Sequence, residues 1–78
     1  MRIVVRYFAR LREIRAADTE EVALEGATSV GDLYAELFPP GPQGVLPVMF
    51  AVNQAYVDKE HALADGDEVA FIPPLGGG

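Results

Sequence analysis

Hydrophobic and polar residues alternate over several short stretches of the chain, with the period of two that is typical of β-strands. The first stretch covers residues 3–8, in which one set of alternate positions is entirely apolar and the other set is mixed. Further alternating stretches cover residues 21–24, 48–52 and 68–72, and a brief apolar segment covers residues 55–57. The pattern therefore predicts four strands and a fifth, short one.

A helical period occurs in residues 30–37, where apolar residues recur every three or four positions. Ser29 directly precedes this segment and Asp32 follows three residues later, which suits a capping box, and Pro39 ends the helix. Gly31 in the first turn lowers the helix propensity by about 1 kcal/mol relative to alanine. We therefore expect this main helix to depend on tertiary packing.

The connections between these elements contain residues that favour turns. Residues 9–15 predict a turn or a short helical connection, so the first two strands are expected to form an antiparallel hairpin. Residues 39–44 form a proline- and glycine-rich surface loop, and Asp65-Gly66 is a tight-turn dipeptide. The resulting order of strand, strand, helix, strand, short strand and strand places the chain in the α+β class.

One main helix can cover only one face of the predicted sheet, so the other face must meet water or a partner. Phe8 and Ile72 fall on that uncovered face by parity, and Tyr56 on the short strand can join them. Isolated apolar residues are common on surfaces, so these three are either scattered or form one docking patch. The residues expected to pack under the helix are Ile3, Val5, Tyr7, Val22, Leu24, Leu33, Leu37, Val69 and Phe71.

The length of 78 residues corresponds to one domain, which we expect to cover residues 1–72, followed by an extended, flexible tail over residues 73–78. The absence of cysteine excludes a disulfide framework, a thiolate metal site and a cysteine nucleophile. The longest apolar run, residues 45–52, is too short to span a membrane, and the arginine-interrupted start lacks a signal-peptide core. We therefore expect a soluble, cytoplasmic protein with no membrane partner.

The formal net charge of −6 is unevenly distributed along the chain. Residues 1–15 contain five arginines and one glutamate, whereas the remainder contains one lysine and eleven acidic residues. An acidic chain argues against a nucleic-acid partner, because phosphate binding requires clustered lysine and arginine. The basic start is either a solvated surface pattern or a polarity used in docking.

Few residues suit conventional catalysis. His61 is the single histidine, and the chain offers it no cysteine or free serine to activate, so a surface or structural role is expected. Several acidic residues lie between Asp58 and Glu68, but their spacing is not that of a calcium loop. We therefore predict no metal site and no bound cofactor.

The chain end offers a different kind of chemistry. No helix follows Gly76, Gly77 and Gly78, so they cannot cradle a phosphate, but they precede a free carboxylate. Pro73 and Pro74 favour an extended start, so six tail residues could reach roughly 20 Å from the sheet. Glycine has no Cβ to prevent close approach, which suits a narrow channel in another protein. Taken alone, a terminal glycine run is also typical of a frayed end or a cloning remnant.

Three segments occur in combination: Phe8-Ala9-x-x-Arg12-Glu13, Ala51-Val52-Asn53-Gln54 and the run from Asp65 to Pro74 before the terminal Gly-Gly. Together they resemble one family, the small subunit of molybdopterin synthase, which belongs to the ubiquitin-like, β-grasp sulfur carriers. The resemblance covers essentially the whole chain, and the last segment is its most specific part. Gly76 departs from the pattern, because relatives often carry another small residue there. The family's fold is a mixed sheet of four to five strands with one main helix packed on one face.

The resemblance implies that Gly78 is the catalytic residue, as a covalent carrier. An adenylyltransferase resembling ubiquitin-activating enzymes would use ATP to adenylate its carboxylate. Sulfur from a cysteine desulfurase or a similar donor would then replace AMP and leave a thiocarboxylate. The synthase large subunit would take up the tail, including Pro73, Pro74, Gly76 and Gly77, and sulfur would pass to cyclic pyranopterin monophosphate to form the molybdopterin dithiolene. The chain would thus donate sulfur within a sulfurtransferase complex and would not be a catalyst alone.

The family also implies an apolar docking face at Phe8, Tyr56 and Ile72, the residues that parity leaves uncovered. Arg12 would add an ion pair at the rim of the interface or form an exposed salt bridge. Three alternatives are a sulfur carrier for another acceptor such as the thiazole of thiamine, a protein modifier that forms isopeptide bonds through Gly78, and a binding module with an incidental tail. The Phe-Ile-Pro-Pro run and the chain length favour molybdopterin.

Overall fold

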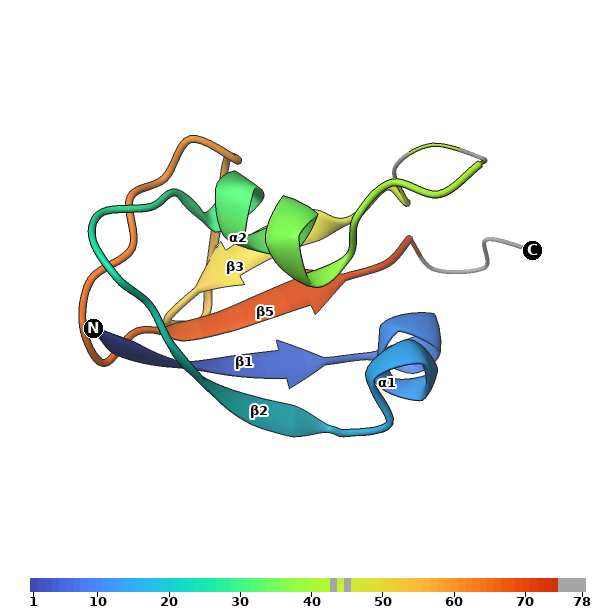
Figure 1. The fold of residues 1–78 in the computed structure, drawn as a ribbon, viewed down its shortest axis with the longest axis horizontal. Coiled ribbons are helices and arrows are strands. Elements are labelled where there is room, and N and C mark those ends of the chain that lie inside the picture. The colour runs from blue at the N-terminus through green and yellow to red at the C-terminus, as the bar shows by residue number, and fades with distance from the viewer. Residues whose placement is uncertain (43, 45, 75–78) are drawn as a thin grey trace.

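The structure is a computed structural model that describes residues 1–42, 44 and 46–74. Five strands form one curved sheet, and two helices pack near it (Figure 1). Neither helix in these ranges is long and apolar enough to cross a membrane. In chain order the elements are β1 (Arg2–Tyr7), α1 (Ala9–Arg15), β2 (Thr19–Ala23), α2 (Val30–Leu37), β3 (Met49–Val52), β4 (Ala55–Val57) and β5 (Glu68–Ile72).

The sheet has the strand order β2-β1-β5-β3-β4. β1 pairs antiparallel with β2 and parallel with β5, whereas β3 pairs antiparallel with both β5 and β4. The predicted hairpin of the first two strands is confirmed, with α1 as its connection. Because β1 and β5 are parallel neighbours, the chain leaves β5 beside the point where it leaves β1 for α1 (Figure 1).

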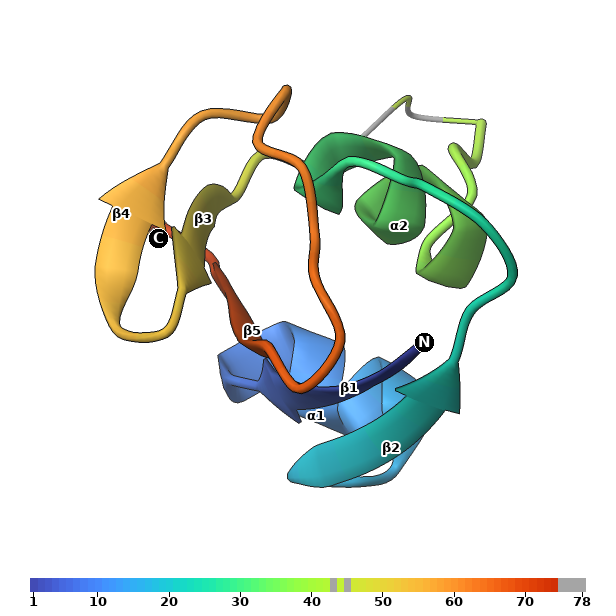
Figure 2. The ribbon, with the colours of Figure 1, turned by 90° about the vertical axis from the view of Figure 1, so that its left-hand side faces the viewer.

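The core lies between α2 and the face of the sheet that curves around it (Figure 2). An aromatic cluster forms its centre: the ring centroids of Tyr34 on α2 and Phe71 on β5 are 4.9 Å apart, and Phe38 meets Phe71 edge-on at 6.2 Å. The buried residues of the core are Ile3, Val5, Tyr7, Leu11, Val30, Leu33, Tyr34, Phe38, Val52, Leu63, Val69 and Phe71.

All the predicted core positions pack within this cluster or against it. Three of them are only partly buried, because they lie at the margin of the core. Val22 is on the edge strand β2, Leu24 directly follows that strand, and Leu37 ends α2. Leu11 and Leu63 are buried although the sequence pattern assigned their segments to connections. Such connections have no regular period, so the alternation of apolar and polar residues cannot predict which of their side chains are buried.

α2 begins in direct contact with the segment that follows β4. The side chain of Ser29 accepts a hydrogen bond from the amide of Asp32 at 3.1 Å, which confirms the predicted cap. The amide of Gly31 donates to the carbonyl of Lys59 at 2.9 Å, and a Cβ at Gly31 would lie 2.8 Å from both the Cβ and the carbonyl oxygen of Lys59. This close approach explains a glycine in the first turn of the helix.

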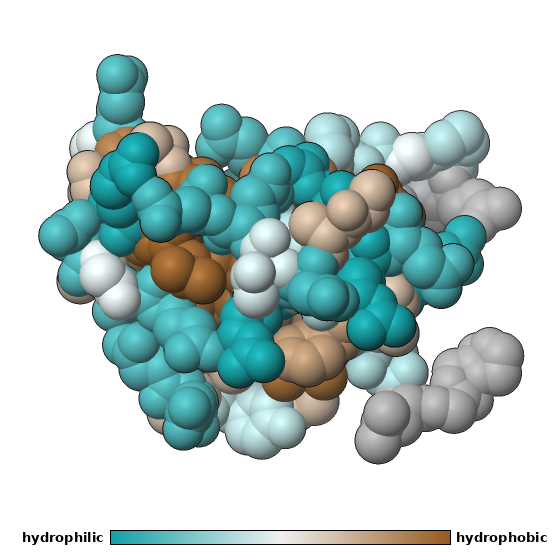
Figure 3. All heavy atoms as spheres, turned by 90° about the horizontal axis from the view of Figure 1, so that it is seen from below, coloured by the Kyte–Doolittle hydropathy of each residue, from teal (hydrophilic) through white to brown (hydrophobic). Residues whose placement is uncertain are grey.

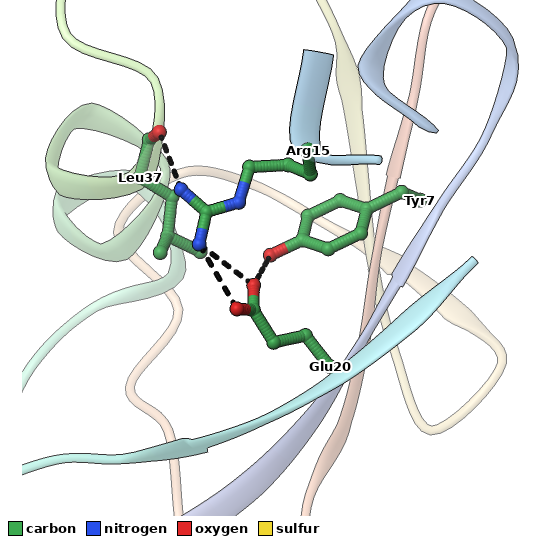
Figure 4. A network of polar contacts seen from close by, with 4 residues as sticks. All are labelled: Tyr7, Arg15, Glu20 and Leu37. Atoms are coloured by element: carbon green, nitrogen blue, oxygen red, sulfur yellow. Dashed lines mark hydrogen bonds and ion pairs between the residues drawn. The ribbon is translucent and has the colours of Figure 1, made fainter. Parts of the chain in front are cut away.

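A polar network holds α1 against the rest of the fold (Figure 4). Glu20 on β2 accepts a hydrogen bond from the hydroxyl of Tyr7 at 2.6 Å and another from Nη2 of Arg15 at 2.8 Å. Arg15 also donates to the carbonyl of Leu37 at 3.5 Å. The bonds from Tyr7 and Arg15 lower the pKa of the Glu20 carboxyl, and burial raises the pKa of Tyr7. Through these contacts the network fixes the chain corner at Phe8, where α1 begins.

Candidate functional site

A hollow of about 220 Å³ lies on the face of the sheet opposite α2. Its floor is formed by Ala51 on β3 and Ala70 on β5, which are direct partners in the ladder. Ala51 also pairs with Tyr56 on β4, and Ala70 also pairs with Arg6 on β1, so four residues form one row across the sheet. The two small side chains in the middle of that row leave the space that larger side chains surround.

Phe8, Tyr56 and Ile72 all line this hollow. Phe8 is 40% exposed and Tyr56 is 69% exposed, whereas Ile72 is partly buried. Phe8 directly follows β1, Tyr56 lies on β4 and Ile72 ends β5, so the pairing of these strands brings the three residues together. The structure thus joins the apolar residues that parity placed on the uncovered face into one surface, which we call the docking hollow.

The position of Phe8 depends on a sharp change of direction after β1. Ala9 has a φ of 50°, in the left-handed region that residues with a side chain seldom adopt, so the chain turns abruptly into α1. The guanidinium of Arg6 lies 6.0 Å from the centroid of the Phe8 ring. Arg6 Nη1 also lies 3.2 Å from an oxygen of Glu68, so a charged pair borders the apolar wall.

A two-residue turn places β4 at the edge of the hollow. Asn53 and Gln54 both have positive φ, at 51° and 71°, as a tight hairpin turn requires. The side chain of Asn53 donates to Asp67 at 2.9 Å and accepts from the amide of Glu68 at 3.0 Å, which ties the turn to the start of β5. These bonds connect the Ala-Val-Asn-Gln and Asp-Gly-Asp-Glu segments. Together the two segments hold Tyr56 beside the sheet.

The remaining predicted site residues lie outside the docking hollow. Arg12 Nη1 is 3.3 Å from an oxygen of Asp18, and both side chains are more than half exposed, so Arg12 forms an exposed salt bridge in this structure. Pro73 and Pro74 directly follow β5. Gly76, Gly77 and Gly78 lie outside the described residues.

Several residues around the hollow were missed by the sequence patterns. Met49 pairs with Ile72 in the ladder and is 53% exposed, so it extends the apolar surface along β3. The alternation along β3 could have indicated this position, because Met49 has the opposite parity to the partly buried Phe50. Ala51 and Ala70 gave no such signal, because only the strand register shows that two alanines are adjacent.

Polar side chains border the apolar part of the hollow. Figure 3 shows the molecule from below, where apolar side chains (brown) occupy small areas framed by hydrophilic ones (teal). Arg6, Gln54 and Glu68 contribute polar groups to the lining itself. Within the described ranges, no group of three or more histidine or acidic residues is arranged to hold a metal ion. An apolar centre with a polar rim is the usual arrangement of a protein-binding surface.

Comparison with known proteins identifies the family. The model of the ThiS family matches residues 5–78. The molybdopterin synthase sulfur carrier subunit of Chlamydomonas reinhardtii is 44% identical over 84 residues, and the alignment covers 100% of both chains.

Solved structures share the fold. A putative molybdopterin converting factor, subunit 1, from Pyrococcus furiosus has a TM-score of 0.76 and 31% identity over 96% of this chain and 99% of its own. Small archaeal modifier protein 1 of Haloferax volcanii has a TM-score of 0.78 and 27% identity over 95% and 98% of the two chains. A complex of subunits 1 and 2 of the molybdopterin-converting factor from Helicobacter pylori contributes a fold likeness at 21% identity, with a TM-score of 0.62 and full coverage of both chains. These likenesses confirm the predicted ubiquitin-like β-grasp fold, and the chain belongs to the ThiS family, with relatives named molybdopterin synthase sulfur carrier subunit.

Proposed function

We propose that the chain is the sulfur-carrier subunit of molybdopterin synthase and acts through the carboxylate of Gly78. The observation that carries this proposal is the continuity of the docking hollow with the start of the tail: Ile72 lines the hollow, and Pro73 is the next residue. A protein that covers the hollow is therefore placed to receive the tail. The full-length similarity to relatives with this name supports the same assignment.

The chemistry begins with activation of a poor electrophile. An adenylyltransferase joins the Gly78 carboxylate to the AMP part of ATP and releases pyrophosphate. The terminal sulfur of a persulfide, supplied by a cysteine desulfurase or a similar donor, attacks the acyl carbon and expels AMP. A thiol then reduces the acyl disulfide, which leaves the Gly78 thiocarboxylate and a disulfide on the donor. This chain has no cysteine and one histidine, so its partners supply the nucleophiles and the acid–base groups.

Docking on the synthase large subunit positions the thiocarboxylate. Phe8, Tyr56 and Ile72 act as apolar anchors, since a few central residues contribute most of the energy of such interfaces. Pro73 and Pro74 each have a fixed φ, so they lower the entropy that the tail loses when it enters a channel. Sulfur passes from Gly78 to cyclic pyranopterin monophosphate, and two rounds complete the dithiolene.

Intact-mass spectrometry tests the carrier chemistry. The chain is produced together with its adenylyltransferase and sulfur donor, and we expect the mass gain that corresponds to sulfur in place of oxygen at Gly78. A variant that lacks Gly77 and Gly78 serves as the control and should gain nothing. Molybdopterin formation by the truncated variant with the large subunit would contradict the proposal.

The same experiment separates the alternatives. A protein modifier would instead become attached to amines of other proteins, with loss of AMP and formation of an isopeptide bond. Lys59 is the single lysine of this chain, so the Lys59→Arg variant removes self-attachment through lysine and simplifies the spectrum. A chain that gains sulfur but transfers none to the pyranopterin on the large subunit would be a carrier for another acceptor, such as a thiazole-forming enzyme.

A further inference from the structure

A second depression lies beside the start of the tail and is separate from the docking hollow. Its volume is about 390 Å³, and most of its wall is apolar or proline. We call this depression the tail-base groove. It adjoins the docking hollow where β1 passes into α1 and β5 passes into Pro73. Phe8 and Ile72 line the hollow, whereas Ala9 and Pro73 line the groove. The groove is lined by Ala9, Arg10, Leu11, Leu46, Pro47, Val48, Pro73 and Pro74.

Arg10 is the charged residue of this groove, and its environment differs from that of the other arginines. Arg2, Arg6, Arg12 and Arg15 each form an ion pair with a carboxylate of the chain. Arg10 is exposed and forms no ion pair or side-chain hydrogen bond with any described residue. A guanidinium presents five N–H donors in a fork that matches a carboxylate, so Arg10 offers a binding group that the rest of the described chain does not use.

The separation of Gly78 from Pro74 determines what must cover this groove. Gly78 is the fourth residue after Pro74, and a fully extended chain spans at most about 14 Å over that length. If Gly78 reacts inside another protein, as the proposed function requires, the surface of that protein must come within this distance of Pro74. The groove beside Pro73 and Pro74 is then part of the interface together with the docking hollow.

We propose that Arg10 binds a carboxylate of the synthase large subunit, the protein that receives the tail. The apolar wall of the groove packs against a neighbouring apolar side chain of that subunit. This inference rests on the proposed function. A protein carboxylate is favoured over a phosphate of the adenylate or of the pterin, because those phosphates belong where Gly78 reacts, inside the receiving protein, whereas Arg10 lies on the exposed surface beside Pro73. The contact gives the basic start of an otherwise acidic chain a role in docking.

An exposed charge at the rim of an interface acts mainly on the rate of encounter. Opposite charges steer two proteins together, and salt screens this attraction over about 10 Å at 0.1 M ionic strength. The Arg10 contact therefore predicts an association rate that falls when the charge is reversed. The effect should diminish as salt is added.

A charge-matched pair of variants tests the contact in the full-length chain. Lys59 is likewise exposed and without an ion pair among the residues described, but it follows β4, packs beside Gly31 in the first turn of α2, and does not line the tail-base groove. Arg10→Glu and Lys59→Glu change the net charge equally. Binding of each to the purified synthase large subunit is measured by surface plasmon resonance at several salt concentrations. We expect Arg10→Glu to lower the association rate about tenfold at low salt, Lys59→Glu to lower it less than about twofold, and Arg10→Gln to fall between them.

The outcomes are distinguishable from those of the proposed function. Equal effects of Arg10→Glu and Lys59→Glu would show that only net charge matters and would overturn the Arg10 contact, as would an unchanged rate in Arg10→Glu. Either result leaves the carrier function intact if the wild-type chain still binds and forms molybdopterin. Absence of binding by the wild-type chain would overturn the proposed function and the Arg10 contact together. Thermal denaturation of each variant verifies that it is folded.

Discussion

The two faces of the sheet use large apolar side chains for different purposes. Phe71 and Ile72 are consecutive residues of β5, but Phe71 is fully buried under α2 whereas Ile72 lines the docking hollow on the opposite face. On the inner face the aromatic rings of α2 and the sheet fill the space. On the outer face Ala51 and Ala70 leave space between the larger residues. The outer surface is thus shaped to receive side chains from another protein.

This difference determines whether an apolar residue contributes to the free energy of unfolding or to the free energy of association. Apolar surface on the inner face leaves water when the chain folds, so it contributes to the free energy of unfolding. Apolar surface at Phe8 and Tyr56 leaves water only if a partner binds, so its contribution belongs to the free energy of association. Substitutions on the two faces should therefore change different quantities.

The largest expected effect concerns the inner face. Phe71→Ala should lower the free energy of unfolding by about 3–5 kcal/mol, because it removes a ring that contacts both Tyr34 and Phe38 and leaves a cavity. The matched control on the outer face is Ile72→Ala, which should cost less than about 1.5 kcal/mol, since that side chain is only partly buried. Urea denaturation measures both values. Similar losses at the two positions would contradict the proposed division of roles.

The next effect concerns the fit of the helix that covers the inner face. Gly31→Ala should destabilise the fold by about 1–3 kcal/mol, because the new Cβ would lie 2.8 Å from backbone and side-chain atoms of Lys59. Helix propensity alone predicts the opposite sign, a gain of up to about 1 kcal/mol. Denaturation of the single variant therefore decides between the two causes, and a stabilised variant would show that the close approach is easily relaxed.

A smaller effect is expected for the outer face, and it should appear in binding. Tyr56→Ala and Ile72→Asp should each weaken association with the synthase large subunit by at least about 1 kcal/mol, while the variants remain folded. Val4→Ala is a suitable control, because Val4 is an exposed apolar residue that does not line the hollow. Titration calorimetry gives the affinities. Unchanged affinity in both test variants, or an equal loss in Val4→Ala, would remove the docking hollow from the interface.

The sequence predicted which face of the sheet a residue occupies better than it predicted the shape of the outer face. Parity placed Phe8 and Ile72 on the uncovered face because strands alternate with a strict period of two. The hollow itself depends on the pairing of Ala51 with Ala70, which is a matter of strand register and is set by contacts distant in sequence. Phe38 was missed for a related reason, since it follows the last helical residue and no period extends to it.

The tail-base groove could not be predicted from any local pattern. It brings the start of α1, the segment before β3 and the residues after β5 together at one end of the sheet. The family resemblance supplied the docking residues and the role of Gly78, but it gave Arg10 no part. The sequence does not distinguish Arg10 from the other four arginines of residues 1–15, because the ion pairs of those four form only in the folded structure.

The smallest effect concerns the polar network that closes the end of the inner face. The pKa of Glu20 is lowered from its ordinary value of 4.5 by the bonds from Tyr7 and Arg15, so the folded state binds fewer protons at this site than the unfolded chain. The stabilisation is therefore present above about pH 4.5 and is lost as the pH falls through the lowered value. Because the side chain of Glu20 is 37% exposed, we expect less than about 1 kcal/mol.

Glu20→Gln removes the titrating group and keeps a side chain of similar shape, so it isolates this contribution from those of the other acidic residues. Wild type should be the more stable at pH 7, and its advantage over the variant should shrink as the pH is lowered to about 3, below the ordinary range of glutamate. Urea denaturation at both pH values gives the two differences. A constant difference would mean that Glu20 acts by its shape and hydrogen bonds alone. A pH-dependent one would show that its charge helps to hold α1, and with it the corner at Phe8, beside the docking hollow.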